Sequence, residues 1–125
     1  MRKLAVTLAL VVTLVAATAA LAATKIAGTY KTTIKTGSLA GTWQVVIGKG
    51  KYTASDNGTV LVMGKYKIKK NVISLTDTGG AGKCTGTGKF KFKLKHKTLT
   101  LTKISDTKAC AARDQVLSHK FKKIA

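Results

Sequence analysis

The strongest constraint on the fold is an alternation of side chains in residues 89–104, KFKFKLKHKTLTLTKI. Phe90, Phe92 and Leu94 alternate with lysines, and after a short polar step two leucines alternate with threonines. Successive side chains of a strand point to opposite faces, so this period of two gives each strand one apolar face and one cationic or polar face. A sheet of this kind covers a core on one side and meets water on the other, which is typical of antiparallel all-β proteins.

Similar patterns recur between turn signals spaced about eight to twelve residues apart, the spacing of a β-sandwich or barrel. Steps such as Asp56-Asn57-Gly58 provide the positive backbone angles that tight turns require. A helical period is absent from nearly all of this region; the exception is the alanine-rich segment 108–117, which could form one helical turn. We predict strands at residues 28–35, 39–47, 50–55, 59–69, 71–77, 86–95, 97–104 and 116–123.

Consecutive strands joined by tight turns form a meander, and eight strands suffice to close a barrel whose interior is filled or holds one small site. Closure also removes the unpaired strand edges that promote aggregation. We therefore predict an all-β fold, an eight-stranded antiparallel up-and-down barrel, with a two-sheet sandwich as the alternative. The side chains predicted to point inward are Tyr30, Ile34, Trp43, Val45, Ile47, Tyr52, Tyr66, Ile68, Ile73, Leu75, Phe90, Phe92, Leu94, Leu99, Leu101, Leu117 and Phe121.

The first residues have the pattern of a targeting segment. Arg2 and Lys3 precede an apolar run, and Ala20-Leu21-Ala22 places small residues at the positions that a signal peptidase reads. The apolar run is also about long enough to span a membrane, so an uncleaved anchor is the alternative. Its alanine and threonine content and the lack of a basic stop after it favour cleavage after Ala22.

We expect a signal peptide at residues 1–22, followed by one β-barrel domain at 23–125 that is secreted or periplasmic. The two cysteines, Cys84 and Cys110, suggest one disulfide, because small exported chains commonly carry such bonds; two free thiols are the alternative. In the predicted meander, the connections that hold them lie at the same end of the barrel, so the bond is geometrically feasible. It would stabilise the fold by about 3–4 kcal/mol in the chain-entropy model.

The chain is strongly basic, with a net charge of +19, to which Arg2 and Lys3 contribute two charges. Lysines in strands occupy the outward phase, where they keep the surface soluble and block edge pairing. The second, fourth and sixth turns of the meander share one end, where their lysines and His96 would form a cationic rim. The lysines of this rim are Lys49, Lys51, Lys69, Lys70, Lys95 and Lys97.

The cationic rim has two interpretations: a solvated surface, or a surface that attracts anionic lipids, cell-envelope polymers or other polyanions. Nucleic acid is the least favoured of these partners. Base stacking and base readout use exposed aromatics and arginines, whereas the aromatics here are predicted to point inward and Arg113 is the one arginine after the targeting segment.

Gly41-Thr42-Trp43 at the start of a strand, followed by a β-meander and by Arg113 before the last strand, resembles the calycin superfamily. Together with Asp106 and Cys110, repeated Gly-x-aromatic steps make the chain similar to small exported bacterial lipocalin-like proteins. These steps are Gly28-Thr29-Tyr30, Gly41-Thr42-Trp43, Gly64-Lys65-Tyr66 and Gly88-Lys89-Phe90. The resemblance covers essentially all of residues 23–125 and implies a lipocalin-like barrel.

The resemblance also implies how one end of the barrel closes. Lipocalins carry an arginine near the C-terminal end that packs over the tryptophan of Gly-x-Trp, which corresponds to Arg113 over Trp43. A guanidinium over an indole face gains about 0.5–2 kcal/mol. Asp106 would hold Arg113 or cap the following turn. We interpret these three residues as barrel closure and not as a binding site.

The residues that catalysis needs are scarce. The four carboxylates of the chain are aspartates in loops, in turns or at a strand end, and their positions suggest neither a carboxylate pair nor a base beside a nucleophile. His96 and His119, with the cysteines oxidised, do not make a zinc site. The glycine-rich segment 79–83 lacks the spacing of a phosphate-binding loop. We expect no enzymatic activity, no catalytic residues, no metal and no cofactor.

The function that this sequence favours is ligand binding by an exported, monomeric barrel. The ligand would be small and apolar or amphiphilic, with Tyr30, Tyr66, Phe90 and Phe92 lining its site and its anionic head at the cationic rim. The alternative is a solid barrel that displays charge and contacts anionic lipids or cell-envelope polymers. A small secreted enzyme is a third, less favoured class.

Overall fold

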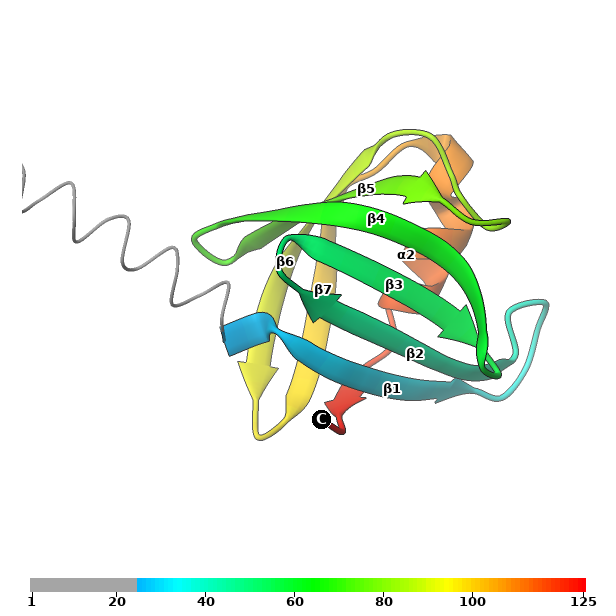
Figure 1. The fold of residues 1–125 in the computed structure, drawn as a ribbon, viewed down its shortest axis with the longest axis horizontal. Coiled ribbons are helices and arrows are strands. Elements are labelled where there is room, and N and C mark those ends of the chain that lie inside the picture. The colour runs from blue at the N-terminus through cyan, green and yellow to red at the C-terminus, as the bar shows by residue number, and fades with distance from the viewer. Residues whose placement is uncertain (1–24) are drawn as a thin grey trace, which may run out of the picture.

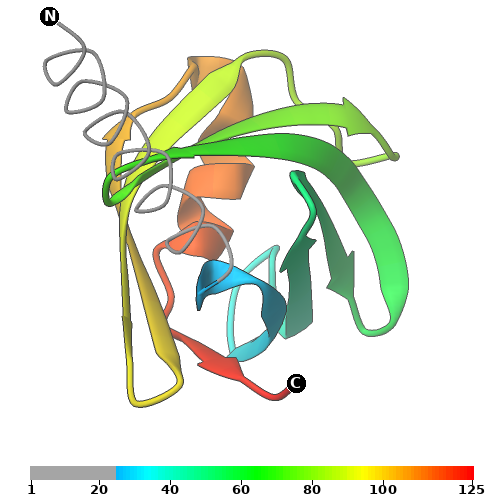
Figure 2. The same cartoon turned by 60° about the vertical axis from the view of Figure 1, so that its left-hand side comes forward.

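The computed structural model describes residues 25–125, so the predicted signal peptide at 1–22 lies outside the described residues. In the described part, eight antiparallel strands form a closed barrel in which each strand pairs with the next and β8 pairs with β1 (Figure 1, Figure 2). The prediction of an eight-stranded antiparallel barrel is therefore confirmed, and the sandwich is excluded. The strands are β1 (Gly28–Ile34), β2 (Gly41–Gly48), β3 (Lys51–Asp56), β4 (Thr59–Lys69), β5 (Val72–Gly79), β6 (Thr87–Lys95), β7 (Thr98–Ser105) and β8 (Phe121–Lys123).

The alternation seen in the sequence is also seen in the burial of side chains. In β6, Gly88 and Phe90 are buried and the lysines beside them are exposed, as expected for a strand with one face on the core. Every side chain predicted to point inward either belongs to the core or packs against it; Ile68, Phe92 and Leu94 are half-buried. Ile26 and Val116 join the core without having been predicted.

The prediction for the last strand is wrong over half of its length. A short 3-10 turn, η1 (Lys108–Cys110), leads into a helix, α2 (Ala111–Leu117), and β8 begins only at Phe121. Cys110, Val116 and Leu117 are buried. Leu117 follows Cys110 by seven residues, about two helical turns, and Val116 lies about 100° around the helix from Leu117. A strand would have separated Val116 and Leu117 onto opposite faces, so helix formation is what lets both cover the barrel interior.

Strand β4 is long and curved, and it wraps across one face of the barrel (Figure 1). The register of its pairing shifts between Ala54 and Ser55 on β3 and between Met63 and Gly64 on β4 itself. Such irregularities increase local twist and bend a strand, which closes a sheet into a barrel. Gly64 lies at this bend, opposite Tyr52 on β3.

The barrel has two different ends. At the rim end lie the β2–β3, β4–β5 and β6–β7 turns, the start of β1 and the C-terminus, whose Ala125 carbonyl accepts from the Thr29 N–H at 2.9 Å. Ile26 is fully buried there, and its carbonyl accepts a hydrogen bond from the Tyr30 hydroxyl at 2.7 Å. At the disulfide end lie the β5–β6 loop, η1 and α2.

Among residues 25–125, no helix has the length and hydropathy that crossing a membrane would require.

Candidate ligand-binding site

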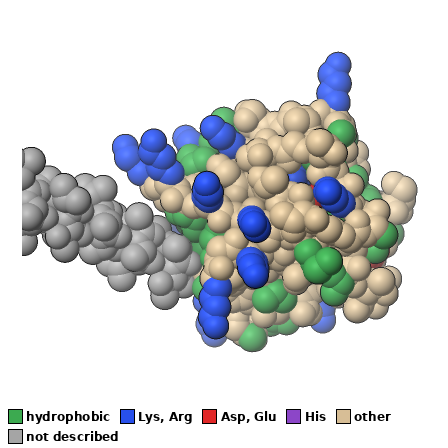
Figure 3. All heavy atoms as spheres, turned by 45° about the horizontal axis from the view of Figure 1, so that its top comes forward, with side chains coloured by type: hydrophobic (Ala, Val, Ile, Leu, Met, Phe, Trp, Pro, Cys, Tyr) green, Lys and Arg blue, Asp and Glu red, His purple; other side chains and the backbone are tan. Residues whose placement is uncertain are grey.

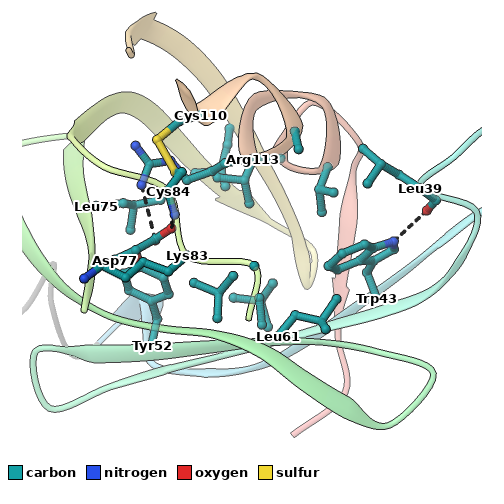
Figure 4. A pocket seen from close by; sticks show the side chains of 18 of the residues that line it. Leu39, Trp43, Tyr52, Leu61, Leu75, Asp77, Lys83, Cys84, Cys110 and Arg113 are labelled. Carbon is teal, nitrogen blue, oxygen red and sulfur yellow. Dashed lines mark hydrogen bonds and ion pairs between the residues drawn. A yellow bond between two sulfur atoms is a disulfide. The ribbon is translucent and has the colours of Figure 1, made fainter. Parts of the chain in front are cut away.

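A cavity of about 290 Å³ occupies the barrel interior toward the disulfide end (Figure 4). Its wall is mostly apolar and comes from β2, β5, β7 and α2, with Trp43, Val45, Leu75, Leu101, Val116 and Leu117 as examples. It reaches the surface at a mouth whose lining residues are at least partly exposed. The residues of this mouth are Leu39, Leu61, Val62, Lys83, Ala109 and Ala112.

One wall of the cavity is polar, and Asp77 is at its centre. Asp77 ends the inward series Ile73, Leu75, Asp77 on β5, and its side chain is 1% exposed. The Tyr52 hydroxyl donates to Asp77 Oδ1, and the Cys84 backbone N–H donates to Oδ2 at 3.0 Å. The buried carboxylate is thus satisfied from β3, which is separated from β5 by β4, and from the loop that follows its own strand.

Arg113 extends the polar wall from α2. Its Nη1 donates to Asp77 Oδ1 at 3.2 Å, while Nε and Nη2 donate to the two carboxylate oxygens of Asp106 at 3.0 and 2.6 Å. The Gly86 carbonyl accepts from Nη2 at 3.3 Å. The two-pronged contact with Asp106 is the geometry that a guanidinium favours with a carboxylate. The prediction that Asp106 holds Arg113 is confirmed; Asp106 also accepts from the Thr107 N–H.

Two glycines make room for this buried cluster. A Cβ at Gly64 would lie 2.3 Å from the Tyr52 ring, and a Cβ at Gly88 would lie 2.6 Å from Asp106 Oδ2. Both glycines belong to the Gly-x-aromatic steps noted in the sequence. Their role is to leave space on the inward face, because a ring or a carboxylate from a neighbouring element occupies the position of the absent side chain.

Burial and hydrogen bonding shift the pKa values of two groups in the cluster. Burial, together with the hydrogen bond to Asp77, raises the pKa of the Tyr52 hydroxyl well above its usual value. Burial alone would also raise the pKa of Asp106, but hydrogen bonds, that from Arg113 being the largest of them, outweigh burial and lower it. Tyr52 is therefore a neutral donor, and Asp106 is an ionised acceptor, at neutral pH.

The disulfide forms part of the cavity wall. Cys84, after β5, is bonded to Cys110 at the end of η1, with their Cα atoms 5.3 Å apart. The predicted Cys84–Cys110 bond is confirmed, and the free-thiol alternative is excluded. The bond fixes the β5–β6 loop to the segment that leads into α2, so it positions both the Cys84 N–H and Arg113.

The predicted stacking of Arg113 over Trp43 is wrong. Figure 4 shows the two side chains on different sides of the cavity, with Trp43 beside Leu39 and Arg113 beside Cys84. The Trp43 indole N–H donates to the Leu39 carbonyl at 2.8 Å, and the guanidinium is turned toward Asp77 and Asp106. Two buried carboxylates attract the guanidinium more strongly than an indole face does, which accounts for its orientation.

The four aromatics predicted to line a ligand site, Tyr30, Tyr66, Phe90 and Phe92, do not line this cavity. Tyr30 and Phe90 are fully buried in the solid part of the core, Tyr66 is buried and Phe92 is half-buried. The space that these large side chains were expected to surround is filled by the side chains themselves. The cavity lies toward the opposite end from the one expected, on the disulfide side.

The residues predicted to form a cationic rim are all exposed and lie at one end, as their turns required. In the space-filling view, blue side chains gather toward the end of the barrel where the β4–β5 turn lies (Figure 3). Lys49, Lys70, His96 and Lys97 have positive φ angles between 50° and 63°. Residues other than glycine and asparagine rarely adopt this backbone conformation, because Cβ approaches the following carbonyl oxygen.

Sequence reasoning missed Tyr52 and Asp77 as site residues. The signal for Asp77 was present, since it continues the apolar phase of Ile73 and Leu75, and an acid on the inward phase must find buried partners. Tyr52 was predicted to point inward, but its hydroxyl partner lies 25 residues away and has no local signal. Within residues 25–125, the structure holds no group of three or more His, Cys, Asp or Glu side chains placed to bind a metal ion.

The fold and the site together define a closed β-barrel with an apolar cavity that has one polar wall. Comparisons of the chain with protein-family models, with curated proteins and with solved structures found no match.

Proposed function

We propose that this protein is an exported, non-catalytic, lipocalin-like carrier that holds a small apolar or amphiphilic molecule in the cavity at the disulfide end. The observation that carries the proposal is the cavity: about 290 Å³, lined mainly by apolar side chains, with a mouth at the surface. Small-molecule sites are typically concave spaces from about 300 Å³ upward, mostly apolar, with a few polar groups that orient the ligand.

The volume sets the size of the ligand. An apolar cavity of about 150 Å³ takes up benzene. A cavity of roughly twice that volume suits a two-ring aromatic molecule or a medium-length alkyl chain.

An unfilled interior also carries an energetic penalty in so small a protein. Unfilled apolar volume loses packing at about 24 cal/mol per Å³, so a cavity of this size forgoes roughly 7 kcal/mol relative to a filled core. Natural domains of this size have net stabilities of only about 5–15 kcal/mol. Retaining such a cavity is easier to explain if a ligand fills it.

Two features support export. The disulfide is formed, and such bonds persist mainly in oxidising compartments. The sequence of residues 1–22 has the three-part pattern of a secretory signal. Intact mass of the protein from a secreting host should show a chain that begins at Ala23; recovery of the uncut chain from membranes would favour an anchor instead.

Titration with N-phenyl-1-naphthylamine, a neutral fluorescent two-ring probe, tests the carrier proposal. We expect saturable, one-site binding with a blue shift of emission. Ala112→Trp should weaken binding at least tenfold, because Ala112 lines the mouth on the exposed side of α2 and an indole there obstructs entry. Ala111→Trp is the matched control, since Ala111 is exposed on the same helix but does not line the cavity. Absence of saturable probe binding to the wild-type protein would show the carrier proposal to be wrong.

One observation favours a second candidate function, attachment to an anionic surface. Lysine occupies positive-φ positions at Lys49, Lys70 and Lys97, where glycine or asparagine would be less strained. Strain that is retained at exposed turns suggests that the charge displayed there is used. The partner would be an anionic lipid or envelope polymer, attracted through the cationic rim.

Sedimentation with vesicles tests this second function. The protein should bind vesicles containing phosphatidylglycerol at low salt and should not bind vesicles of pure phosphatidylcholine. It should dissociate at high salt, because surface charges are screened within about 10 Å at 0.1 M salt. Replacing Lys70, Lys95 and Lys97 by glutamine should weaken binding more than replacing Lys35, Lys89 and Lys108, exposed lysines outside the rim. Equal losses would mean that net charge, and not the rim, governs attachment.

A further inference from the structure

We propose that the polar wall of the cavity selects a neutral ligand that carries a hydroxyl or amide group over a ligand of the same length that carries a carboxylate. This inference rests on the proposed carrier function and names the class of molecule that the same cavity takes. It follows from the charge of the buried cluster that forms the wall, from the free hydrogen-bonding positions of the wall and from the solvent exposure of Lys83, the other cation that lines the cavity.

The buried cluster that forms the wall is net negative, because it includes Asp106, which binds Arg113 but does not itself line the cavity. Two carboxylates, Asp77 and Asp106, face one guanidinium, Arg113, and the side chains are 1%, 0% and 8% exposed. Tyr52 is a neutral donor, so it does not offset the second negative charge. A ligand carboxylate placed against this wall would add like charge in a site where water cannot screen it.

The free hydrogen-bonding positions of the wall also suit a neutral group. Within residues 25–125, Arg113 directs four N–H groups to Asp77, Asp106 and the Gly86 carbonyl, which leaves one N–H on Nη1. Tyr52 donates its proton to Asp77 and keeps its oxygen as an acceptor, and Asp77 Oδ2 has room for a second donor beside the Cys84 N–H. A hydroxyl can donate and accept at once, so it matches this set; a carboxylate can only accept.

The other cation that lines the cavity, Lys83, is not part of the buried cluster. Lys83 lines the cavity but is exposed. An anionic amphiphile could therefore enter tail first, with its head beside Lys83 in water. Its apolar tail would then lie against Asp77 and Tyr52 and leave their free acceptors without partners, which is unfavourable.

Displacement of bound N-phenyl-1-naphthylamine by 1-decanol, kept below its solubility limit, and by decanoate, kept below its critical micelle concentration, tests the inference. We expect decanol to displace the probe at a concentration at least tenfold lower than decanoate. Saturable probe binding with equal displacement, or with decanoate the stronger competitor, would overturn the inference and leave the carrier function standing. Absence of saturable probe binding would overturn both.

Three variants separate the wall from the mouth and from net charge. Asp77→Asn should reduce the ratio of the displacing concentrations of decanoate and decanol at least threefold, because it removes one charge and keeps the side-chain shape. Asp56→Asn is the matched control: it makes the same charge change at a residue that does not line the cavity, and it should leave the difference unchanged. If Asp77→Asn fails to fold by circular dichroism, Tyr52→Phe decides instead: it should weaken decanol binding and leave decanoate binding unaltered.

Lys83→Gln completes the test at the mouth. We expect this variant to weaken the binding of decanoate at least threefold and to leave the binding of decanol unchanged, since only an anion bound tail first depends on this lysine. Loss of decanol binding in this variant, with decanoate unaffected, would place the selecting group at the mouth and contradict the role given to the wall.

Discussion

The two ends of this barrel are built from the same strands and differ in almost everything else. The rim end has tight turns, exposed lysines and an interior filled by large side chains such as Tyr30 and Tyr66. The disulfide end has a long loop, a helix, a disulfide and a cavity. All four carboxylates of the sequence, Asp56, Asp77, Asp106 and Asp114, lie at or near the disulfide end and none lies in the rim turns.

This difference shows how one strand pattern can support a solid half and a hollow half. Toward the rim the inward positions hold aromatics, which fill the space between strands. Toward the disulfide end they include the small Ala54, which lines the cavity, and Gly64 and Gly88, whose inward space is taken by Tyr52 and Asp106. The remaining space is bounded by a helix whose position depends on buried ion pairs and on the disulfide. Packing stabilises the first half, whereas polar contacts and a covalent bond stabilise the second.

The largest expected effect comes from removing the guanidinium at the disulfide end. Arg113→Ala leaves the carboxylates of Asp77 and Asp106 buried without their cation, which should lower the free energy of unfolding by about 3–5 kcal/mol in urea denaturation. Lys97→Ala at the rim is the comparison, and a change within about 0.5 kcal/mol is expected there. If Arg113→Ala costs less than 1 kcal/mol, the polar cluster does not stabilise the hollow half as described.

Loss of the disulfide should have the next largest effect. Replacing both Cys84 and Cys110 by serine should lower the free energy of unfolding by about 3–4 kcal/mol, because the unfolded chain regains the entropy of the open loop. Amide hydrogen exchange should accelerate more in α2 than in the β6–β7 hairpin. Equal acceleration at both ends would mean that the bond stabilises the whole barrel evenly and does not act mainly on the hollow half.

Alkaline pH should affect both halves through buried tyrosines. Burial raises the pKa of Tyr30 from 10.0 to about 12, and the pKa of Tyr52 is raised as well. An acid whose pKa is higher in the folded state holds its proton more tightly there, so its contribution to stability is complete below pH 10 and is lost as the pH rises above it. Stability should fall between pH 10 and 12, with tyrosinate absorbance at 295 nm appearing together with unfolding.

Replacing Tyr30 or Tyr52 by phenylalanine tests directly whether these hydroxyls cause the loss of stability at alkaline pH. Tyr30→Phe should cost about 1 kcal/mol at pH 7, since it removes the hydrogen bond to the Ile26 carbonyl, and it should make the alkaline decline shallower. Free titration of tyrosine absorbance in the native protein near pH 10 would contradict the burial of these hydroxyls.

The smallest expected effect is at the rim. Lys70→Gly should raise the free energy of unfolding by about 0.5–1 kcal/mol, because glycine adopts a positive φ without the steric cost that lysine bears. Lys69→Gly, at the neighbouring strand position, should lower it by a similar amount. Destabilisation by both changes would show that the turn is not strained and would weaken the case for a functional rim.

The strands could be predicted from sequence because alternation is a local property. The alternation of apolar and polar residues in β6 and β7 can be recognised without knowing which strands pair with them. The order of consecutive antiparallel strands then implies which turns share an end of the barrel. The same reasoning placed Cys84 near Cys110. The segment Ala111–Leu117 shows the limit: its buried residues are few, so a short helix and the start of a strand could not be separated with certainty by pattern alone.

The cavity could not be predicted because it depends on volumes summed across strands that are distant in sequence. Whether space remains beside Val45 or Leu101 is decided by what Ala54, Leu61 and α2 contribute from other strands and from the helix. Asp77 was on the inward phase and signalled a buried polar site. Its partners Tyr52 and Arg113 lie 25 and 36 residues away, and no local pattern pairs them.

The paths of the two chain ends have a practical consequence. The chain enters β1 at the rim end beside Ile26, and the C-terminal residues Ile124 and Ala125 exchange hydrogen bonds with Thr29 at that same end. The cavity mouth lies away from both. A fusion partner, an affinity tag or an immobilising tether joined directly before residue 25 or after Ala125 would therefore leave the mouth facing outward, so the barrel can be mounted on a sensor surface without obstructing entry.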